Sequence, residues 1–122
     1  LKNEKKKYNI FYFNGKKIFN KNFQEYLKEV NKFGIGEVMI NSIDRDGTGH
    51  GLDINILKSV PKNFNIPIIF TGGAGHGDHF IEALQDSRIN AVATANLLNF
   101  LGNGLEISRK KVEKKINLPI WL

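Results

Sequence analysis

Three short and almost wholly apolar runs constrain the fold of this chain more than any other feature of its sequence. They lie at residues 37–41, 66–71 and 91–95, and segments with helical periodicity separate them. Strands that are apolar throughout are typical of a parallel sheet that is covered on both faces. Parallel strands need right-handed crossover connections, which helices usually supply. The alternation therefore predicts an α/β fold with parallel strands.

A further strand and a helix precede the first of these runs. Residues 8–13 are rich in aromatic and β-branched side chains and stop at an Asn-Gly pair, which predicts a strand that enters a turn. Asn20 or Asn22 can cap the helix that follows, and Gly34 can close it in the left-handed conformation. The apolar residues of this helix recur at helical spacing: Phe23, Tyr26, Leu27, Val30 and Phe33.

The remaining segments repeat this order of strand and helix. We expect Asp53 to cap a short helix that Pro61 ends, and a second helix to include residues 80–84. A terminal helix with a lysine-rich outer face is predicted at residues 105–116. Gly-rich or polar loops follow all three apolar strands, at the strand ends where both barrels and open doubly wound sheets bind ligands. Both architectures remain open on the pattern alone.

Length and composition indicate a single unit that spans residues 1–122. The chain is 41% hydrophobic and 25% charged, and it is too short for a second domain. It has no cysteine, which excludes disulfides and thiolate metal sites and favours a cytoplasmic setting. No signal peptide or membrane-spanning run is visible. Because the first periodic segment begins almost at once and no initiator Met precedes it, we expect a fragment of a longer chain.

The net charge of +6 lies mainly at the two ends of the chain. Residues 5–7 and 109–115 are rich in basic side chains, but no aromatic residues are interleaved with them. We interpret both segments as solvated faces rather than as a nucleic-acid-binding patch. No metal site is expected, because His50, His76 and His79 have no third ligand at a suitable spacing. These histidines are interpreted as capping or solvent-facing residues.

The loop at residues 41–49 combines two carboxylates, two hydroxyls and two glycines at a strand end. Carboxylates can exchange protons with a substrate, and neighbouring backbone N–H groups can bind an anion. A calcium loop is an alternative, since Asp44, Asp46 and Gly49 match positions one, three and six of an EF-hand. This alternative fails at position twelve, which is Asn55 instead of a bidentate Glu, and its flanks resemble strands.

Two further loops carry the pattern of an anion site. Residues 71–77 form a Gly-rich turn between a buried strand and a helix, where backbone N–H groups and the helix N-terminus attract negative charge. The dinucleotide-binding fingerprint is not met, because Asp78 stands where its third glycine would be. Residues 93–100 end the third strand with small residues before a short helix. Because loops after neighbouring strands often form the phosphate site of a barrel, this pair predicts a phosphate ligand.

Several motifs occur in the order in which one enzyme family has them. Phe-Gly-Ile-Gly-Glu at 33–37, Ser-Ile-Asp-Arg-Asp-Gly-Thr at 42–48, Gly-Gly-Ala-Gly at 72–75 and His-Phe at 79–80 resemble motifs of the cyclase subunit of imidazole glycerol phosphate synthase. Asn-Gly-Lys-Lys at 14–17 resembles an earlier loop of that family. The resemblance covers essentially the whole chain, but only the C-terminal half of the family's fold. It implies that this chain is the C-terminal half of a (β/α)8 TIM barrel.

The resemblance also implies a reaction of histidine biosynthesis. Enzymes of this family convert a bisphosphorylated aminoimidazole carboxamide ribonucleotide and ammonia into imidazole glycerol phosphate and aminoimidazole carboxamide ribotide, without a metal or organic cofactor. A glutaminase subunit supplies the ammonia. Their acid and base are aspartates at the ends of the first and fifth strands, and Leu1 falls just after the fifth. We therefore expect the fragment alone to be inactive.

The resemblance carries over the supporting half of the site to this chain. Asp46 matches a supporting active-site carboxylate after the sixth strand, and Glu37 matches a charged residue at the opposite barrel end, where ammonia enters. The positions that match phosphate-binding backbone donors are Gly47, Gly73, Ala95 and Asn96. The substrate-facing positions are Asn41, Thr71 and Gly72.

Two departures from the family leave alternatives open. The family usually has Ser at the position of Asn96 and Thr at that of Asn41, although both replacements still form hydrogen bonds. A related subunit of surface-sugar amidation systems would keep the phosphate site and change the substrate. The isomerase one step earlier shares the Asp-Arg-Asp-Gly-Thr loop, but Gly-Gly-Ala-Gly followed by His79 and Phe80 favours the cyclase. The remaining alternative is a non-catalytic phosphate-binding half barrel that self-associates through its open sheet.

Overall fold

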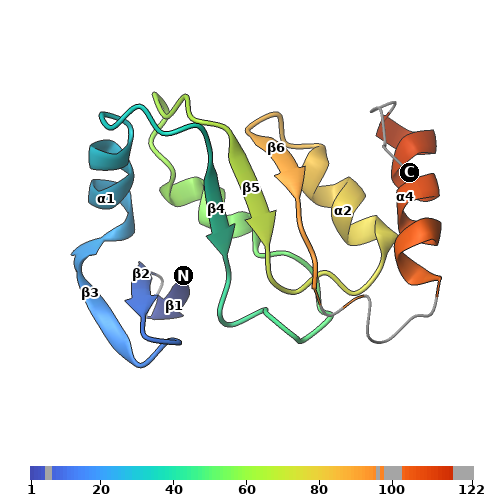
Figure 1. Cartoon of the computed structure of the whole chain (residues 1–122), viewed down its shortest axis with the longest axis horizontal. Coiled ribbons are helices and arrows are strands. Elements are labelled where there is room, and N and C mark those ends of the chain that lie inside the picture. Colours follow the sequence, from blue (N-terminus) through green and yellow to red (C-terminus); the bar gives the residue numbers. More distant parts are fainter. Residues whose placement is uncertain (5–6, 96, 98–102, 117–122) are drawn as a thin grey trace.

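The computed structural model describes residues 1–4, 7–95, 97 and 103–116 of the chain. Within these residues it contains an antiparallel and a parallel sheet of three strands each, with helices around them (Figure 1). The elements in chain order are β1 (Lys2–Glu4), β2 (Lys7–Tyr12), β3 (Lys17–Asn22), α1 (Phe23–Val30), β4 (Val38–Asn41), the 3₁₀ helix η1 (Ile54–Ser59), β5 (Ile68–Thr71), α2 (Gly77–Leu84), β6 (Ile89–Val92) and α4 (Gly104–Ile116).

The parallel sheet has the strand order β4-β5-β6, which confirms an α/β fold with parallel strands. Val38 lies beside Ile68 and Asn41 beside Thr71, so that the carboxyl ends of β4 and β5 meet at one edge of the sheet. The connection from β4 to β5 contains η1, and α2 connects β5 to β6. These helical crossovers return the chain to the same end of the sheet, as the alternation of segments predicted. The third strand ends at Val92, earlier than expected.

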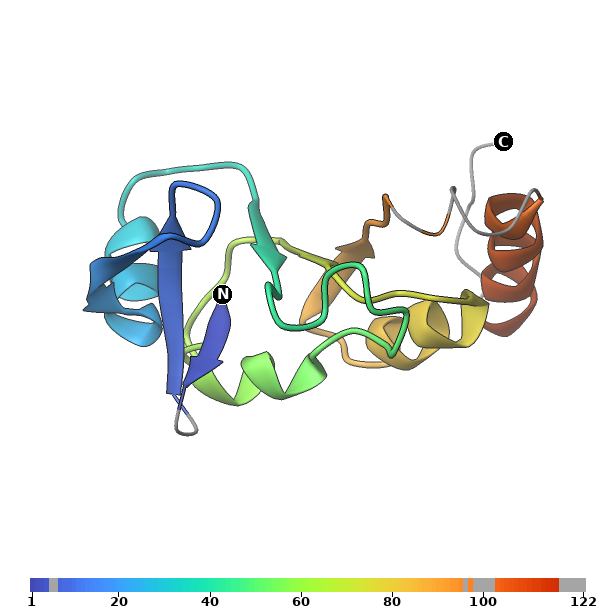
Figure 2. The ribbon, with the colours of Figure 1, turned by 90° about the horizontal axis from the view of Figure 1, so that it is seen from below.

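Among the described residues, helices cover one face of the parallel sheet and leave the other open. Figures 1 and 2 show from two directions that η1 and α2 lie against the same face. Ile40 and Phe70 are buried in the core, whereas Met39, whose side chain alternates to the other face, is 60% exposed. The cover on both faces that apolar strands usually indicate is therefore not present at Met39, whereas an uncovered apolar face agrees with the open sheet expected of a fragment. The buried core consists of Phe23, Leu27, Ile40, Leu52, Ile56, Leu57, Val60, Ile68, Phe70, Ala74, Phe80, Ile81, Ala83, Ile89, Leu97 and Val112.

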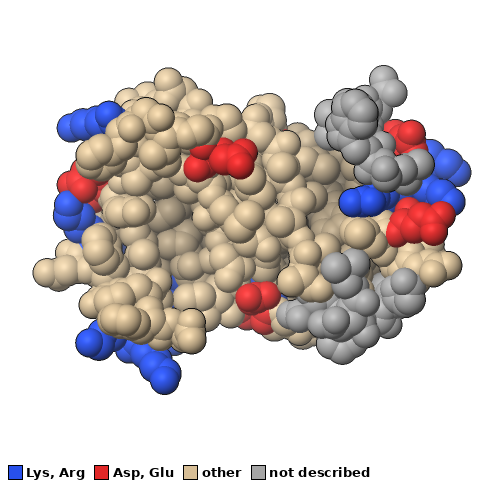
Figure 3. Space-filling model, viewed as in Figure 1, with Lys and Arg blue, Asp and Glu red and all other residues tan. Residues whose placement is uncertain are grey.

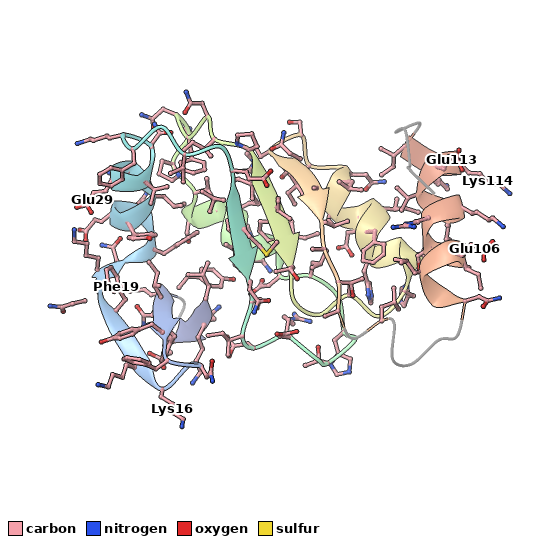
Figure 4. All side chains as sticks on the ribbon, in the orientation of Figure 1. Lys16, Phe19, Glu29, Glu106, Glu113 and Lys114 are labelled. Carbon is pink, nitrogen blue, oxygen red and sulfur yellow. The ribbon has the colours of Figure 1, made fainter. Side chains whose placement is uncertain are left out.

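The helices form where the sequence supplies caps and apolar faces. The Asn22 side chain accepts a hydrogen bond from the backbone N–H of Glu25 at 2.9 Å, which confirms the predicted cap of α1. Such a cap stabilises a helix by about 1 kcal/mol. The terminal helix is confirmed as α4, and Figure 4 shows Glu106, Glu113 and Lys114 on its outer side. Its inner side buries Ser108 and Val112 among other residues, which places the charged face toward solvent.

The first 22 residues contain an antiparallel sheet that the sequence pattern did not predict. β2 confirms the strand expected at residues 8–13, but it lies between β1 and β3 and not in the parallel sheet. The turn after it is confirmed, with positive φ angles at Asn14 and Gly15, and Figure 4 shows Lys16 at its tip. β3 was missed because all of its residues are exposed, so that apolar and polar side chains do not alternate along it.

Two hydrogen bonds join the start of the chain to the parallel sheet. The N-terminal amine of Leu1 donates to the Asn41 carbonyl, and the backbone N–H of Ile43 donates to the Leu1 carbonyl at 2.7 Å. Leu1 thus bonds to Asn41 and Ile43, the two neighbours of Ser42. This is the hydrogen-bond pattern of paired residues in parallel strands, and we call the pair of Leu1 and Ser42 the Leu1 rung. Ser42 itself donates its backbone N–H to Thr71 of β5, so that Leu1 lies at the other edge of β4.

A hydrogen bond from Tyr8 ties the antiparallel sheet to the start of η1. Tyr8 Oη donates to Asp53 Oδ2 at 3.0 Å. Asp53 occupies the N-cap position but its side chain makes no capping hydrogen bond, so that the predicted capping role is wrong. Burial of the phenol, and its hydrogen bond to the carboxylate, raise the pKa of Tyr8 to about 12.

Positive charge gathers at the two ends of the face visible in Figure 3, and the middle of that face is mostly uncharged apart from two separate acidic patches. This view looks onto the open face of the parallel sheet, which Figure 2 shows on the side away from η1 and α2. None of the helices in the described part of the chain has the length and apolar character that a bilayer crossing requires.

We predict that Tyr8→Phe lowers the free energy of unfolding by about 1 to 2 kcal/mol near neutral pH, because Asp53 loses its donor. The folded pKa lies above that of an unfolded tyrosine, so that the hydrogen bond contributes below about pH 10 and its contribution is lost toward pH 12. Urea unfolding of both proteins at several pH values measures this difference. Tyr26→Phe is the matched control, and an equal loss from it would contradict the role of Tyr8.

Candidate functional site

A hollow of about 540 Å³ lies where the carboxyl ends of β4, β5 and β6 meet. Its volume suits a small organic molecule, and its position is the usual ligand site of parallel sheets. We call it the strand-end hollow. It is lined by Met39, Asn41, Asp46, Gly47, Thr48, Gly49, Thr71, Gly72, Gly73, Ala74, Gly75, Thr94, Ala95 and Leu97.

The strand-end hollow brings together most residues that the sequence analysis assigned to a substrate site. Glu37 lies elsewhere, since it is exposed and precedes β4 at the opposite end of the strand. That position agrees with the end of the sheet expected for it, and its role stays a prediction. Asn96 lies outside the described residues. The predicted residues that line the hollow are Asn41, Asp46, Gly47, Thr71, Gly72, Gly73 and Ala95.

Several backbone donors of the strand-end hollow are unpaired within the described part of the chain. The N–H groups of Gly47, Gly73 and Ala95 have no acceptor among the described residues. They come from three different loops, each of which follows one strand of the parallel sheet. Free backbone N–H groups that gather at strand ends can hold an anion without a charged side chain. The hollow therefore presents backbone donors of the kind that can bind an anion.

The loop after β4 is fixed by hydrogen bonds within itself. Thr48 donates its hydroxyl to the Arg45 carbonyl at 2.7 Å and accepts from the backbone N–H of His50 at 3.2 Å. Arg45 closes the loop by donating Nη1 to the His50 carbonyl at 3.1 Å. Gly47, at the turn of this loop, has a φ of +77°, which favours glycine. The loop therefore presents the Gly47 backbone in a defined conformation.

The loops after β4 and β5 pack against each other through their backbones. The N–H of Gly51 donates to the Gly73 carbonyl at 2.8 Å. Gly73 has a φ of +105°, and a Cβ atom there would meet the Gly51 carbonyl and lie 2.7 Å from Arg45 Cβ. A Cβ at Gly72 would lie 2.5 Å from Asn41 Oδ1. Glycine is required at both positions, because any side chain would separate the two loops.

Polar side chains at the strand ends add acid–base and hydrogen-bonding groups. Asn41 and Thr71 are neighbours in register at the ends of β4 and β5. Asn41 Nδ2 lies 3.4 Å from Asp46 Oδ2, a long hydrogen bond that directs the carboxylate toward the strand end. Asp46 is exposed, so that its carboxylate is accessible to a ligand in the hollow. These three side chains can orient the part of a ligand that is not held by the backbone.

Sequence reasoning missed the apolar part of the lining. The sequence places Met39 in a strand and Leu97 before a short helix, but an apolar side chain gives no sign of which face it occupies. Thr48 and Thr94 also line the hollow. Their positions in the loops at residues 41–49 and 93–100 are the sequence feature that could have identified them. The sequence therefore predicts the polar lining of the hollow but not its apolar part, which includes Met39 and Leu97.

The histidines lie beside this site. His79 Nδ1 accepts a hydrogen bond from the backbone N–H of Gly75 at 3.1 Å, and its ring centroid is 3.7 Å from that of His76. Burial, and then the neighbouring His76, lower the pKa of His79. Lys111 of α4 forms an ion pair with Asp78 at 2.5 Å, and the pKa of that carboxyl is lowered by the hydrogen bond from Lys111. Among the described residues no group of three potential metal ligands occurs.

The chain matches the family model described as histidine biosynthesis protein over residues 2–102. A putative imidazole glycerol phosphate synthase subunit hisF2 of Parasynechococcus marenigrum (strain WH8102) is 40% identical over 102 residues, which is 82% of this chain and 38% of that protein. The imidazole glycerol phosphate synthase subunit HisF of Methanococcus maripaludis (strain C5 / ATCC BAA-1333) is 36% identical over 98 residues, which is 80% of this chain and 36% of the relative.

A third relative, the subunit HisF of Bacillus cereus (strain G9842), is 32% identical over 116 residues, which is 95% of this chain and 46% of the relative. The chain thus spans less than half the length of the curated relatives it matches. The matched part includes all three strands of the parallel sheet and the loops of the strand-end hollow.

We predict that Gly73→Ala lowers the free energy of unfolding by about 3 kcal/mol or more, because the methyl group would meet two backbone segments at a strained φ. Chemical denaturation measures the loss. Gly36→Ala is the matched control, since a Cβ there meets nothing within 4 Å. It should change stability by less than about 0.5 kcal/mol. Equal effects of the two changes would show that the loops are not held together at Gly73.

Proposed function

This chain belongs to the histidine biosynthesis protein family, and from that membership we propose that it is part of the cyclase subunit of imidazole glycerol phosphate synthase. The proposed substrates are a bisphosphorylated aminoimidazole carboxamide ribonucleotide and ammonia. The products are imidazole glycerol phosphate and aminoimidazole carboxamide ribotide. The relatives that carry the synthase name support this proposal, and the complete reaction is assigned to a longer chain.

The observation that carries the proposal is the set of free backbone N–H groups in the strand-end hollow. Gly47, Gly73 and Ala95 supply one donor each, and a phosphate group has acceptor oxygens for all three. A substrate with a phosphate group at each of its two ends needs a separate binding site for each phosphate. We assign one phosphate to these donors, with Asn96 as a further donor. The scarcity of positive side chains in the middle of this face favours backbone binding.

The side chains around the phosphate site have proposed roles toward the rest of the substrate. We assign Asp46 as a supporting carboxylate, because it is exposed beside Asn41 at the end of β4. Asn41, Thr71 and Gly72 face the substrate and fix its orientation through hydrogen bonds. The main acid and base of the reaction are assigned to aspartates of strands that this chain does not contain.

Residues 1–122 form one unit in this proposal, the C-terminal half of a (β/α)8 barrel. The rung between Leu1 and Ser42 supports it, because it extends the parallel hydrogen-bonding pattern past the edge of β4. The open face supports it as well, since Met39 lies where further barrel strands would cover it. Alone, the unit is expected to bind phosphate esters weakly and to catalyse no reaction.

The proposed partner is a glutaminase subunit that supplies ammonia. Glu37 is assigned to the ammonia entrance, since it precedes β4 at the end of the sheet opposite the strand-end hollow. No metal or organic cofactor and no nucleic acid or membrane partner is part of the proposal. A cytoplasmic location is proposed with it, as for a biosynthetic enzyme without cysteine.

Self-association is a second candidate behaviour. It is favoured by the exposed Met39 and by the edge of β4, which among the described residues is met by Leu1 at its carboxyl end. We predict that the chain forms dimers or larger species at micromolar concentration, and that Met39→Lys shifts it toward monomers by placing a charge on the open face. Light scattering of both proteins measures the difference. A wild-type chain that remains a monomer without exposed apolar surface would contradict this candidate.

The alternative of a surface-sugar amidation subunit rests on Asn41, which replaces the Thr usual in the cyclase. Such a subunit would keep the phosphate donors of the strand-end hollow and accept another phosphorylated substrate. Assays with the imidazole precursor and with a phosphorylated sugar acceptor, each with ammonium, separate the two enzymes.

The central test combines this chain with a polypeptide that supplies the first half of the barrel from a relative. We predict that the reconstituted protein forms imidazole glycerol phosphate from the ribonucleotide and ammonium, and that each half alone forms none. Asp46→Asn should lower kcat/KM by about a hundredfold, because a carboxylate that handles protons or charge is lost. Product formation is followed by chromatography.

Asp44→Asn is the matched control for that change. Asp44 belongs to the same loop, but its carboxylate accepts from the backbone N–H of Asn3 at 2.6 Å and does not line the strand-end hollow. Its replacement should alter kcat/KM by less than about threefold. Absence of product from a folded reconstituted protein would refute the cyclase assignment.

A further inference from the structure

His79 contacts both loops that form the floor of the strand-end hollow. It stands in the first turn of α2, and its Nδ1 accepts the backbone N–H of Gly75 in the loop after β5. The other side of its ring faces the loop after β4, because a Cβ atom at Gly51 would lie 3.3 Å from His79 Cδ2 and 3.4 Å from Nε2. Gly51 in turn donates to the Gly73 carbonyl. One imidazole therefore supports the place where the two loops meet.

The contact with Gly75 depends on the protonation state of the ring. A histidine nitrogen accepts a hydrogen bond only when it carries no proton, so that Nδ1 can accept from Gly75 only in the neutral ring with the proton on Nε2. Protonation would place two donors against each other. The Gly75 N–H would lose its acceptor, and the ring would have to turn away from the loop.

The surroundings of His79 act on its charge from several elements. Burial and the ring of His76 lower its pKa, and His50 from the loop after β4 acts in the same direction. The N-terminal end of α2 also disfavours a positive ring. Glu82 and Asp78 of the same helix raise the pKa, but Lys111 of α4 forms an ion pair with Asp78. The balance favours the neutral ring.

We propose that His79 is a positioning residue that holds the loops of residues 47–51 and 72–77 together while its imidazole is neutral, so that anion binding in the strand-end hollow weakens on acidification. The inference rests on the proposed phosphate site and adds its regulation. This direction of the pH dependence, with weaker binding at lower pH, is unusual for an anion site. A histidine that contacted the anion directly would strengthen binding when it gained a positive charge, whereas His79 weakens binding by releasing a loop.

The pH range follows from the direction of the shift. Because the folded-state pKa lies below the ordinary value of 6.5, the contribution of His79 is complete above about pH 6.5 and is lost as the pH falls through the folded-state value. Sulfate is a suitable probe, since it carries two negative charges throughout this range and matches the shape of a phosphate group. Changes in its affinity then report on the protein alone.

The test uses the whole 122-residue chain and three variants. His79→Asn keeps an acceptor near the position of Nδ1 that does not titrate, His79→Leu removes the acceptor, and His50→Asn is the control for loss of a nearby histidine. We expect the Kd of the wild type and of His50→Asn for sulfate to rise by about fivefold or more between about pH 7.5 and 5. The Kd of His79→Asn should change by less than about twofold, and His79→Leu should bind weakly at both.

Hydrogen exchange of the Gly75 amide without any anion tests the contact separately. Its protection should fall on acidification in the wild type and stay constant in His79→Asn. Constant protection in the wild type, or tighter sulfate binding at low pH, would overturn the proposed role of His79. Failure of the folded wild type to bind sulfate at any pH would instead refute the phosphate site itself, whatever the Gly75 amide does.

Discussion

The rest of the structure depends on the direct packing of two glycine-rich loops. The loop after β4 and the loop after β5 approach so closely that a Cβ atom at Gly73 or Gly75 would meet backbone atoms of the opposite loop. Only the absence of side chains permits the hydrogen bond between Gly51 and Gly73 and leaves N–H groups of both loops free at the surface of the hollow. The binding chemistry of this site is therefore a property of backbone geometry.

The parallel sheet makes this packing possible. In-register pairing of β4 with β5 brings Asn41 beside Thr71, and each helical crossover returns the chain so that every strand ends at the same edge. η1 and α2 cover one side of the sheet (Figure 2), and Ile40 and Phe70 belong to the core. The opposite side is left with apolar side chains such as Met39, which explains why the hollow combines polar backbone with an apolar wall.

Features that depend on neighbouring residues could be predicted from the sequence. Features that depend on contacts between distant segments, or on which face of a strand is covered, could not. The parallel strands, α1 with its Asn22 cap and the loops of the strand-end hollow follow from periodicity, capping and glycine placement. β3 escaped because an exposed strand carries no alternation, and Asp53 was misjudged because Tyr8, far away in sequence, binds its carboxylate. The same limit applies to Met39, since an apolar residue in a strand does not reveal whether anything covers it.

The open face also determines how strongly the backbone donors can bind. Hydrogen bonds to an anion are weak where water competes and strengthen as the site is enclosed and its dielectric constant falls. In the proposed full barrel, further strands beyond the Leu1 rung would cover Met39 and close the hollow from the side that now faces solvent. The loops themselves would not need to move, because glycine packing already fixes them. On this proposal the chain would carry the shape of the phosphate site, and closure of the barrel would supply most of the affinity.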